Sequence, residues 1–293
     1  MRVLLTGGTG YIGKHVVSIL QNRGVPTLIL GKKPLDHMPS NFQFAECDLL
    51  RSSSFDVIQQ FKPTHLIHLA WFAKHGEFWT SVENTQWVTS TIDLVEQFAA
   101  SGGQHLTVSG TCAEYSWDET VCEENVTSIC PSTIYGKAKN LTHECLQLLC
   151  DSKGLSLAWA RVFFPFGGAG EHPNRLFPSL VSALRAGKSI EVNGCLQRDF
   201  LHVEDMAAAL AHLSLGSKKG VFNMASGETL SIKQFGDLVA THLGKSPDLV
   251  VDNRAGAFGQ PMIISACVQQ LKSTGWSPAM SVIERLATFL SKD

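Results

Sequence analysis

The sequence lacks the features that mark several classes of protein. It holds no run of about 18 apolar residues, so no transmembrane helix is expected. Its first residues pass into a short apolar stretch and then glycines, without the pattern of a signal peptide. A formal net charge of -2 provides no basic surface for nucleic acid. We therefore expect a cytoplasmic protein that binds neither membranes nor nucleic acid.

Cysteine and histidine are present, but not in ligand-like patterns. The 8 cysteines are scattered without a C-x-x-C, which predicts free thiols. His65 and His68 share an apolar, strand-like run in which their side chains would point to opposite faces. Neither disulfides nor a metal site are expected.

The glycines near the start of the chain follow a recognisable spacing. An apolar run at 2–6 leads into Thr-Gly-Gly-Thr-Gly-Tyr-Ile-Gly, which is followed by a helix-like segment. Gly7, Gly10 and Gly13 allow a tight turn, close approach of the backbone to a pyrophosphate, and close packing of helix on strand. A plain strand-to-helix turn is the alternative, but the position between strand and helix favours a dinucleotide site. The turn residues also expected to contact the cofactor are Thr9, Tyr11 and Ile12.

Apolar runs then alternate with helix-like segments along the first half of the chain. Strands are expected at 26–30, 42–46, 63–70, 105–109 and 155–162, and helices at 84–100 and 135–149. This alternation predicts an α/β protein with a Rossmann-like, doubly wound parallel sheet. Ligands bind at the carboxyl ends of the strands in such sheets.

The residues after the second and third strands bear on the choice of dinucleotide. Lys32 and Lys33 stand where an NAD-preferring fold would usually have an acid, and cations there suit a 2′-phosphate. NADP(H) is therefore preferred and NAD(H) remains possible, since two lysines can also lie on a solvated loop. Asp48 could bond the adenine amino group.

A tyrosine and a lysine four residues apart are the candidate proton-transfer pair. On a helix, Tyr135 and Lys139 would share one face, and a nearby positive charge favours the phenolate. Alone, this spacing is also that of an ordinary surface helix. Thr111, after the strand at 105–109, supplies a second hydroxyl.

Taken together, these motifs resemble the extended short-chain dehydrogenase/reductase family that modifies nucleotide-activated sugars. The matching segments are Thr-Gly-Gly-Thr-Gly-Tyr-Ile-Gly at 6–13, Leu-Ile-His-Leu-Ala at 66–70, Ser109/Thr111, Tyr135-x-x-x-Lys139, Arg161, Gln-Arg-Asp-Phe-Leu-His-Val-Glu-Asp at 197–205, Phe-Asn-Met-Ala-Ser-Gly at 222–227 and Gly275-Trp276. The segment after Arg161, Phe-Phe-Pro-Phe-Gly-Gly, departs from the Asn and Tyr-Gly-Pro that the family often has there.

The resemblance implies roles for individual residues. Thr111 would bond the substrate oxygen, Tyr135 would be the acid or base, and Lys139 would hold the nicotinamide ribose and lower the phenol pKa. Further cofactor contacts are implied for Leu49, Leu69, Ala70, Ser109 and Phe163, and substrate contacts for Trp71, Arg175, Arg198 and Arg254. Asp199, His202 and Asp205 are expected to be structural.

The resemblance also implies an organisation of the chain. The dinucleotide-binding domain would comprise 1–164 plus 196–226, including a helix at 204–215 and a strand at 221–225, and a smaller C-terminal substrate-binding lobe would comprise 165–195 plus 227–293. A homodimer is expected through the helices at 84–100 and 136–150. The second of these carries an apolar stripe of Leu141, Cys145, Leu148 and Leu149, which could equally be core.

Several reactions are compatible with these motifs. Related 4,6-dehydratases follow the active-site Thr with Asp-Glu, whereas Cys112-Ala113 follows here, which argues against dehydration. The two lysines favour NADPH-dependent reduction of a nucleoside-diphosphate 4-keto-6-deoxyhexose, as in deoxysugar biosynthesis. An NAD-dependent sugar-nucleotide 4-epimerase is the alternative. A non-catalytic dinucleotide sensor is more remote, because such proteins usually lose the Tyr or the Lys.

Overall fold

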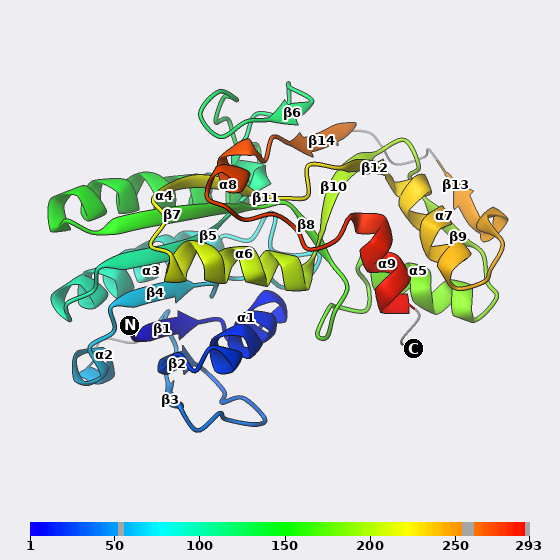
Figure 1. Ribbon diagram of the computed structural model, residues 1–293. Helices are drawn as coiled ribbons and strands as arrows, with labels where there is room; N and C mark the ends of the chain where they lie inside the picture. Colours follow the sequence, from blue (N-terminus) through cyan, green and yellow to red (C-terminus); the bar gives the residue numbers. More distant parts are fainter. Residues whose placement is uncertain (52–55, 254–260, 291–293) are drawn as a thin grey trace. The chain divides into compact units, whose positions relative to one another are not determined.

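The chain folds into two compact units (Figure 1). The computed structural model describes residues 1–51, 56–253 and 261–290. The first unit comprises Met1–Ser116, Ser128–Val162 and Ala207–Phe222, and the second comprises Trp117–Thr127, Phe163–Met206 and Asn223–Asp293. The second unit includes 117–127, 163–164, 196–206 and 223–226, which the sequence assigned to the dinucleotide-binding domain.

The first unit is built on a seven-stranded sheet with the order β11-β7-β5-β4-β1-β2-β3. Its strands are β1 (Val3–Thr6), β2 (Thr27–Gly31), β3 (Phe42–Glu46), β4 (His65–His68), β5 (His105–Thr111), β7 (Ser156–Val162) and β11 (Gly220–Met224). β1 pairs in parallel with both β2 and β4, so the chain order reverses there. The predicted doubly wound sheet is confirmed, and the reversal point is where such sheets bind ligands.

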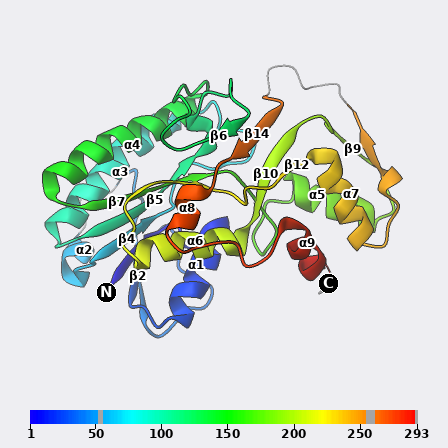
Figure 2. The ribbon, with the colours of Figure 1, turned by 45° about the horizontal axis from the view of Figure 1, so that its top comes forward.

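Helices cover this sheet, and its central strands β1, β4 and β5 are almost wholly buried, as parallel strands with helices on their faces are. The helices are α1 (Tyr11–Asn22), α2 (Asp56–Phe61), α3 (Glu83–Ala100), α4 (Ile134–Lys153) and α6 (Val203–Leu215), the last of which begins in the second unit. α3 and α4 run side by side (Figures 1 and 2). Phe98 of α3 and Leu146 of α4 are fully buried in one core with Leu4, Leu66 and Leu106 of the sheet. This packing fixes α4, and with it Tyr135, relative to β5.

The second unit has short strands around a phenylalanine-rich core. Its elements are β6 (Val121–Cys122), β8 (Phe164–Phe166), α5 (Leu176–Arg185), β9 (Ile190–Val192), β10 (Gln197–His202), β12 (Thr229–Ser231), α7 (Ile232–His242), a 3₁₀ turn η2 (Pro247–Leu249), β13 (Val250–Asp252), β14 (Ile263–Ala266), α8 (Gln269–Ser273) and α9 (Val282–Leu290). β10 pairs in parallel with β8 and β14 and antiparallel with β12. Phe200 of β10 stacks on Phe235 of α7 at 4.2 Å between ring centroids.

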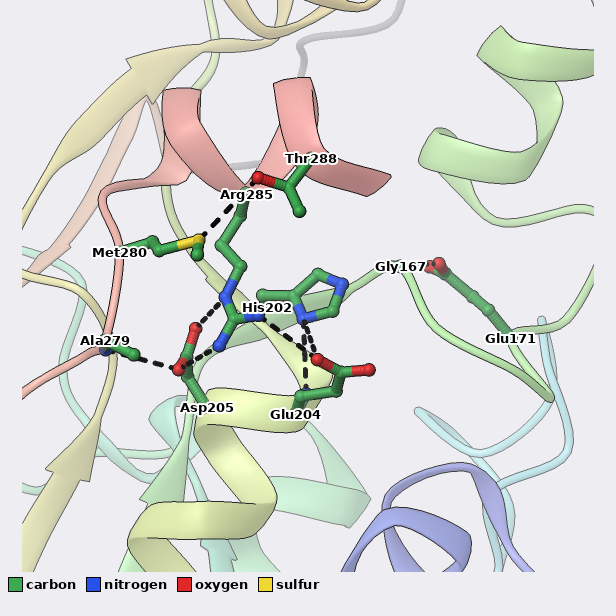
Figure 3. Close-up of polar contacts among 9 residues, drawn as sticks. All are labelled: Gly167, Glu171, His202, Glu204, Asp205, Ala279, Met280, Arg285 and Thr288. Atoms are coloured by element: carbon green, nitrogen blue, oxygen red, sulfur yellow. Dashed lines mark hydrogen bonds and ion pairs between the residues drawn. The ribbon is translucent and has the colours of Figure 1, made fainter. Parts of the chain in front are cut away.

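Buried carboxylates tie segments of this unit together (Figure 3). Arg285 of α9 forms a bidentate pair with Asp205, with both N···O distances 2.6 Å. The Asp205 carboxylate also accepts a bond from the N–H of Ala279. Asp199 accepts hydrogen bonds from Ser226 and Gly227. These contacts are those of structural residues, as expected for Asp199 and Asp205.

Two sequence-based expectations concern the whole chain. The eight cysteines all lie among the described residues, and none of them forms a disulfide bond. Among the residues that the structure describes, no helix is long and apolar enough to cross a membrane.

Candidate active site

The glycine turn between β1 and α1 is closed so tightly that side chains are excluded. Gly7 adopts a φ of +72°, and its carbonyl accepts a hydrogen bond from the N–H of Gly10 at 3.0 Å. A Cβ at Gly13 would lie 2.0 Å from the Gly7 carbonyl oxygen, and a Cβ at Gly7 would lie 2.7 Å from the N of Ala70. Glycine is therefore required at both positions.

The start of α1 is suited to an anion. Gly10 caps the helix, and no side chain in the described part of the chain caps it by hydrogen bonding. No acidic residue lies in the first turn, so the N–H groups and the helix dipole can face a phosphate. Thr9 is exposed, and Tyr11 and Ile12 are half-buried. The turn thus fits the pyrophosphate of a dinucleotide.

Hydrogen bonds join the carboxyl ends of β1 and β4 beside this turn. The Thr6 hydroxyl lies 2.7 Å from Nδ1 of His68 and accepts a bond from the N–H of Ala70. His68 is buried, and its Nε2 lies 3.0 Å from the Thr91 hydroxyl. Burial lowers the pKa of His68 to about 3, so its ring is neutral. Ala70 and its neighbour Leu69 are half-buried at this edge.

Lys32, predicted to meet a 2′-phosphate, has a protein partner. Its ammonium lies 3.1 Å from a carboxylate oxygen of Asp48, which is also 3.9 Å from Arg51. Burial works to raise the pKa of Asp48, but these cations and the N–H of Leu50 prevail and lower it. A 2′-phosphate would thus compete with Asp48 for Lys32. Lys33 is exposed.

Leu49, another predicted cofactor contact, is buried in the first unit. Only 6% of its surface is exposed, and it belongs to the apolar core of that unit. Its place in the core does not test the predicted contact.

Tyr135 is brought to Thr111 by close packing at the start of α4. Thr111 ends β5, and Thr133 caps α4 by accepting a hydrogen bond from the N–H of Gly136. A Cβ at Gly136 would lie 2.2 Å from the carbonyl oxygen of Ala113, so this glycine lets the helix approach. The Tyr135 phenol and the Thr111 side chain are hydrogen-bonded, so the two hydroxyls lie next to each other.

Burial sets the protonation state of Tyr135. It raises the pKa of the phenol, and the neighbouring Cys112 and Glu114 add to the rise, whereas the bond with Thr111 opposes it. The lowering expected from Lys139 is therefore not the net result. A phenol with a raised pKa is protonated at neutral pH and can donate to a carbonyl oxygen.

Lys139 is buried one turn along the same helix. Its ammonium donates to the carbonyl oxygen of Ser109 at 2.6 Å and lies 3.8 Å from the centroid of the Trp71 ring. Burial lowers the pKa of Lys139 to about 7, although the Glu114 charge opposes this. The Ser109 hydroxyl donates to the carbonyl oxygen of His68.

Glu114 was not predicted from the sequence, although it fixes Thr111. It lies in the 3₁₀ turn η1 (Cys112–Glu114) and is fully buried. Its carboxylate accepts bonds from the Thr111 N–H at 2.7 Å, from Trp159 Nε1 at 3.0 Å and from Arg161 Nε at 2.7 Å. The pattern Thr-Cys-Ala-Glu is that of a capping box, which is the signal that could have found it.

The remaining predicted residues belong to the second unit or lie outside the described residues. The Arg198 guanidinium is buried and donates to the carbonyl oxygens of Gln197 and Met262. Arg175 donates to the carbonyl oxygen of Pro165 and forms an ion pair with Glu171. Their substrate contacts stay predictions.

The last two residues with predicted contacts are Phe163 and Arg254. Phe163 is buried, and its N–H donates to the Met224 carbonyl oxygen. Arg254 lies outside the described residues.

Two solved structures share the fold of this chain over almost its whole length. The structure of MoeE5 in complex with UDP-glucose and NAD has a TM-score of 0.85 and 25% identity, covering 99% of this chain and 98% of that one. UDP-N-acetylglucosamine 4-epimerase from Methanobrevibacter ruminantium has a TM-score of 0.86 at 21% identity, covering 99% and 97%, and supports the fold alone.

Two curated relatives match most of this chain. UDP-glucose 4-epimerase of Bos taurus is 28% identical over 96% of this chain and 93% of its own. A dTDP-6-deoxy-L-talose 4-dehydrogenase (NAD(+)) of Aggregatibacter actinomycetemcomitans is 26% identical over 80% and 87%. The profile of one family matches residues 3–225, which hold the glycine turn, Thr111, Tyr135 and Lys139. The chain therefore belongs to the NAD dependent epimerase/dehydratase family.

Proposed function

We propose that this enzyme is a sugar-nucleotide 4-epimerase that acts on a uridine diphosphate hexose. The observation that supports this most directly is the hydrogen-bonded pair of Tyr135 and Thr111, which can bracket a single oxygen on a sugar. Several of the relatives are UDP-glucose 4-epimerases, and MoeE5 binds UDP-glucose. This reverses the preference drawn from the sequence, which favoured a reductase.

In this proposal the side chains exchange one proton with the sugar. Tyr135 removes the proton of the C4 hydroxyl and returns it to the same oxygen after the opposite face of C4 has regained its hydrogen, while the Thr111 hydroxyl stabilises the charge that builds on the oxygen. A bound nicotinamide dinucleotide supplies the hydride acceptor and donor. The phenol pKa must fall for the first step, and a cation at Lys139 acts in that direction.

We propose NAD rather than NADP as the resident cofactor. The feature that favoured NADP, Lys32, is paired with Asp48 at 3.1 Å, so its charge is already balanced. Lys33 alone would remain for a 2′-phosphate. The structure of MoeE5 with UDP-glucose contains NAD, which supports the same choice.

A second candidate is reduction of a nucleoside-diphosphate 4-keto-6-deoxyhexose. One observation favours it: the raised pKa of Tyr135 keeps the phenol protonated, and a reductase needs only to donate that proton. The relative that is a dTDP-6-deoxy-L-talose 4-dehydrogenase belongs to this redox chemistry.

One experiment separates these reactions. The purified enzyme is incubated with UDP-glucose or UDP-galactose that carries deuterium at C4, and the products are resolved by chromatography and NMR. An epimerase converts each into the other, keeps the deuterium at C4 and consumes no added dinucleotide. Dinucleotide extracted from the protein should be NAD.

A second assay uses the substrates of a reductase, and a positive result in it would contradict the epimerase proposal. The enzyme is given NADPH or NADH with dTDP-, CDP- or GDP-4-keto-6-deoxyhexose, and absorbance at the nicotinamide band is followed. Stoichiometric oxidation here, without conversion of either UDP-hexose, would replace the epimerase with the reductase. Tyr135→Phe serves as the inactive control in both arms.

We also propose that the enzyme forms a homodimer through α3 and α4. Leu141 and Leu148 of α4 have 49% and 75% of their surface exposed, and Cys145 lies half-buried between them. Two turns of a helix therefore present an apolar stripe that a second copy can cover. Leu149, of the predicted stripe, packs against the core instead.

We expect light scattering to give a mass twice the 31.9 kDa of one chain. Leu148→Glu should shift that mass toward a single chain, because a buried, unpaired carboxylate opposes association. Val126→Glu, a change at an exposed valine outside α4, is the matched control. A wild-type mass of one chain in dilute buffer would contradict the proposal.

A further inference from the structure

Trp71, predicted to contact substrate, lies against the candidate catalytic lysine. The Lys139 ammonium lies 3.8 Å from the centroid of the Trp71 ring, which is cation–π distance. The other tryptophan of this cluster, Trp87, is 5.9 Å from Trp71 between ring centroids. The indole N–H of Trp71 donates to Oδ1 of Asn84 at 2.8 Å, which fixes the rotation of the ring.

Asn84 connects Trp71 to the segment that follows it. This residue lies in the first turn of α3, and none of its surface is exposed. Its amide nitrogen donates to the carbonyl oxygens of Phe78 at 2.7 Å and Ser81 at 2.8 Å. Both amide protons and the carbonyl oxygen are therefore used, and no other side chain of this size offers the same set.

The segment held by Asn84 packs on Tyr135. The rings of Phe78 and Trp79 meet the Tyr135 ring edge-on, with centroid distances of 5.0 and 5.7 Å and interplanar angles of 83° and 87°. The carbonyl oxygen of Trp79 also accepts a hydrogen bond from the Tyr135 N–H. The buried Asn84 amide thus holds both Trp71, which contacts Lys139, and the Phe78–Trp79 segment, which contacts Tyr135.

We propose that Asn84 and Trp71 are positioning residues: Trp71 holds the Lys139 ammonium, and Asn84 holds both Trp71 and the Phe78–Trp79 segment against Tyr135. The inference rests on the proposed function only in that Tyr135 and Lys139 carry the chemistry. The contact between Trp71 and Lys139 can be tested without substrate.

The charge state of Lys139 is the quantity that Trp71 should influence. The face of an aromatic ring favours the ammonium form, whereas burial lowers the pKa of Lys139 to about 7. The titratable groups around it are Glu114 from η1, which raises its pKa, His68 from β4, and Tyr135 on its own helix. His68 is neutral and Tyr135 protonated near pH 7, because burial moves the pKa of each away from neutrality.

The test is an NMR titration of Lys139 in protein labelled at lysine Cε, with Lys139→Arg used to assign the signal. Trp71→Leu should lower the pKa of Lys139 by about one unit, the shift expected when a desolvated cation–π contact is lost. Trp71→Phe keeps a ring and should shift it by less than half as much. Trp87→Phe changes the ring that lies 5.9 Å from Trp71 and takes no part in the Asn84 hydrogen bonds described above, and it should leave the pKa unchanged.

Activity supplies the second readout. Trp71→Leu and Asn84→Leu should each lower kcat about tenfold with little change in KM. Because the Lys139 cation is the form that lowers the phenol pKa, kcat should fall as the pH rises through the lysine pKa, and this fall should move to lower pH in Trp71→Leu. Trp71→Met replaces Trp71→Leu if the latter does not fold. An unchanged Lys139 pKa in the ringless variant would overturn the proposal. Wild-type protein that turns over no sugar nucleotide would refute the proposed function, yet leave the titration valid.

Discussion

Replacing Tyr135 with phenylalanine is expected to lower kcat by about 10²- to 10⁴-fold, the range that a positioned general acid or base supplies. The substitution removes one oxygen atom. The ring stays in place, because its edge-on contacts with Phe78 and Trp79 do not involve the hydroxyl. The bond with Thr111 is lost, so a substrate oxygen would meet one hydroxyl instead of two. Steady-state turnover of the UDP-hexose measures the effect.

Binding should survive this substitution. The glycine turn and the start of α1 are separate in sequence from Tyr135, and their geometry depends on Gly7 and Gly13. We therefore expect dinucleotide affinity, followed by tryptophan fluorescence, to stay within about threefold of wild type, which is under 1 kcal/mol. Turnover at the wild-type rate would show that the proton comes from another group. Loss of binding together with turnover would show that the phenol is structural.

The first unit could be predicted from the sequence because most of its strands are runs of buried residues. The predicted strands at 42–46 and 155–162 match β3 and β7 to within a residue, and the helix at 84–100 matches α3. The second unit could not be predicted in detail. Its strands β6 and β9 have two and three residues, too short for any periodicity to show.

Residues of the candidate site could be predicted where the signal is a short pattern of neighbouring residues in the sequence. Gly13 and the four-residue spacing of Tyr135 and Lys139 are local patterns, and the structure has them as expected. The ion pair of Lys32 was not predictable in this way, because its partner Asp48 comes from a neighbouring strand end. The environment of Trp71 likewise depends on Asn84, thirteen positions later.

Glu114 is the clearest case of a residue whose partners are distant in sequence. Two of the three groups that donate hydrogen bonds to its carboxylate lie more than 40 positions away. The Thr111 N–H is local, but Trp159 and Arg161 lie on β7. The Arg161 guanidinium also lies 4.5 Å from the centroid of the Tyr115 ring. Burial raises the pKa of Glu114, whereas the ion pair with Arg161 and the N–H donors favour the carboxylate. A buried charge of this kind is tolerated only with all its partners present.

Arg161→Met should therefore destabilise the protein by about 3–5 kcal/mol, the cost of leaving a buried charge without its partner. The side chains of Arg161 and Glu114 are 3% and 0% exposed, so water cannot replace the lost contact. Arg161→Lys keeps the charge but not the Nε geometry, and should cost less. Urea unfolding followed by fluorescence gives the loss as a change in midpoint.

Two comparisons decide whether this loss comes from the buried pair. Lys233→Met removes an ion pair with Asp237 whose side chains are about one third exposed, and such pairs contribute under about 1 kcal/mol. The double variant Glu114→Met/Arg161→Met removes both charges and should recover part of the stability of Arg161→Met. Recovery cannot be complete, because the N–H groups of Thr111 and Trp159 are left unpaired, at about 1–3 kcal/mol each. A loss in Arg161→Met no larger than that in Lys233→Met would mean that Glu114 is not held as a charge, and that the bond its side chain accepts from the Thr111 N–H does not depend on Arg161.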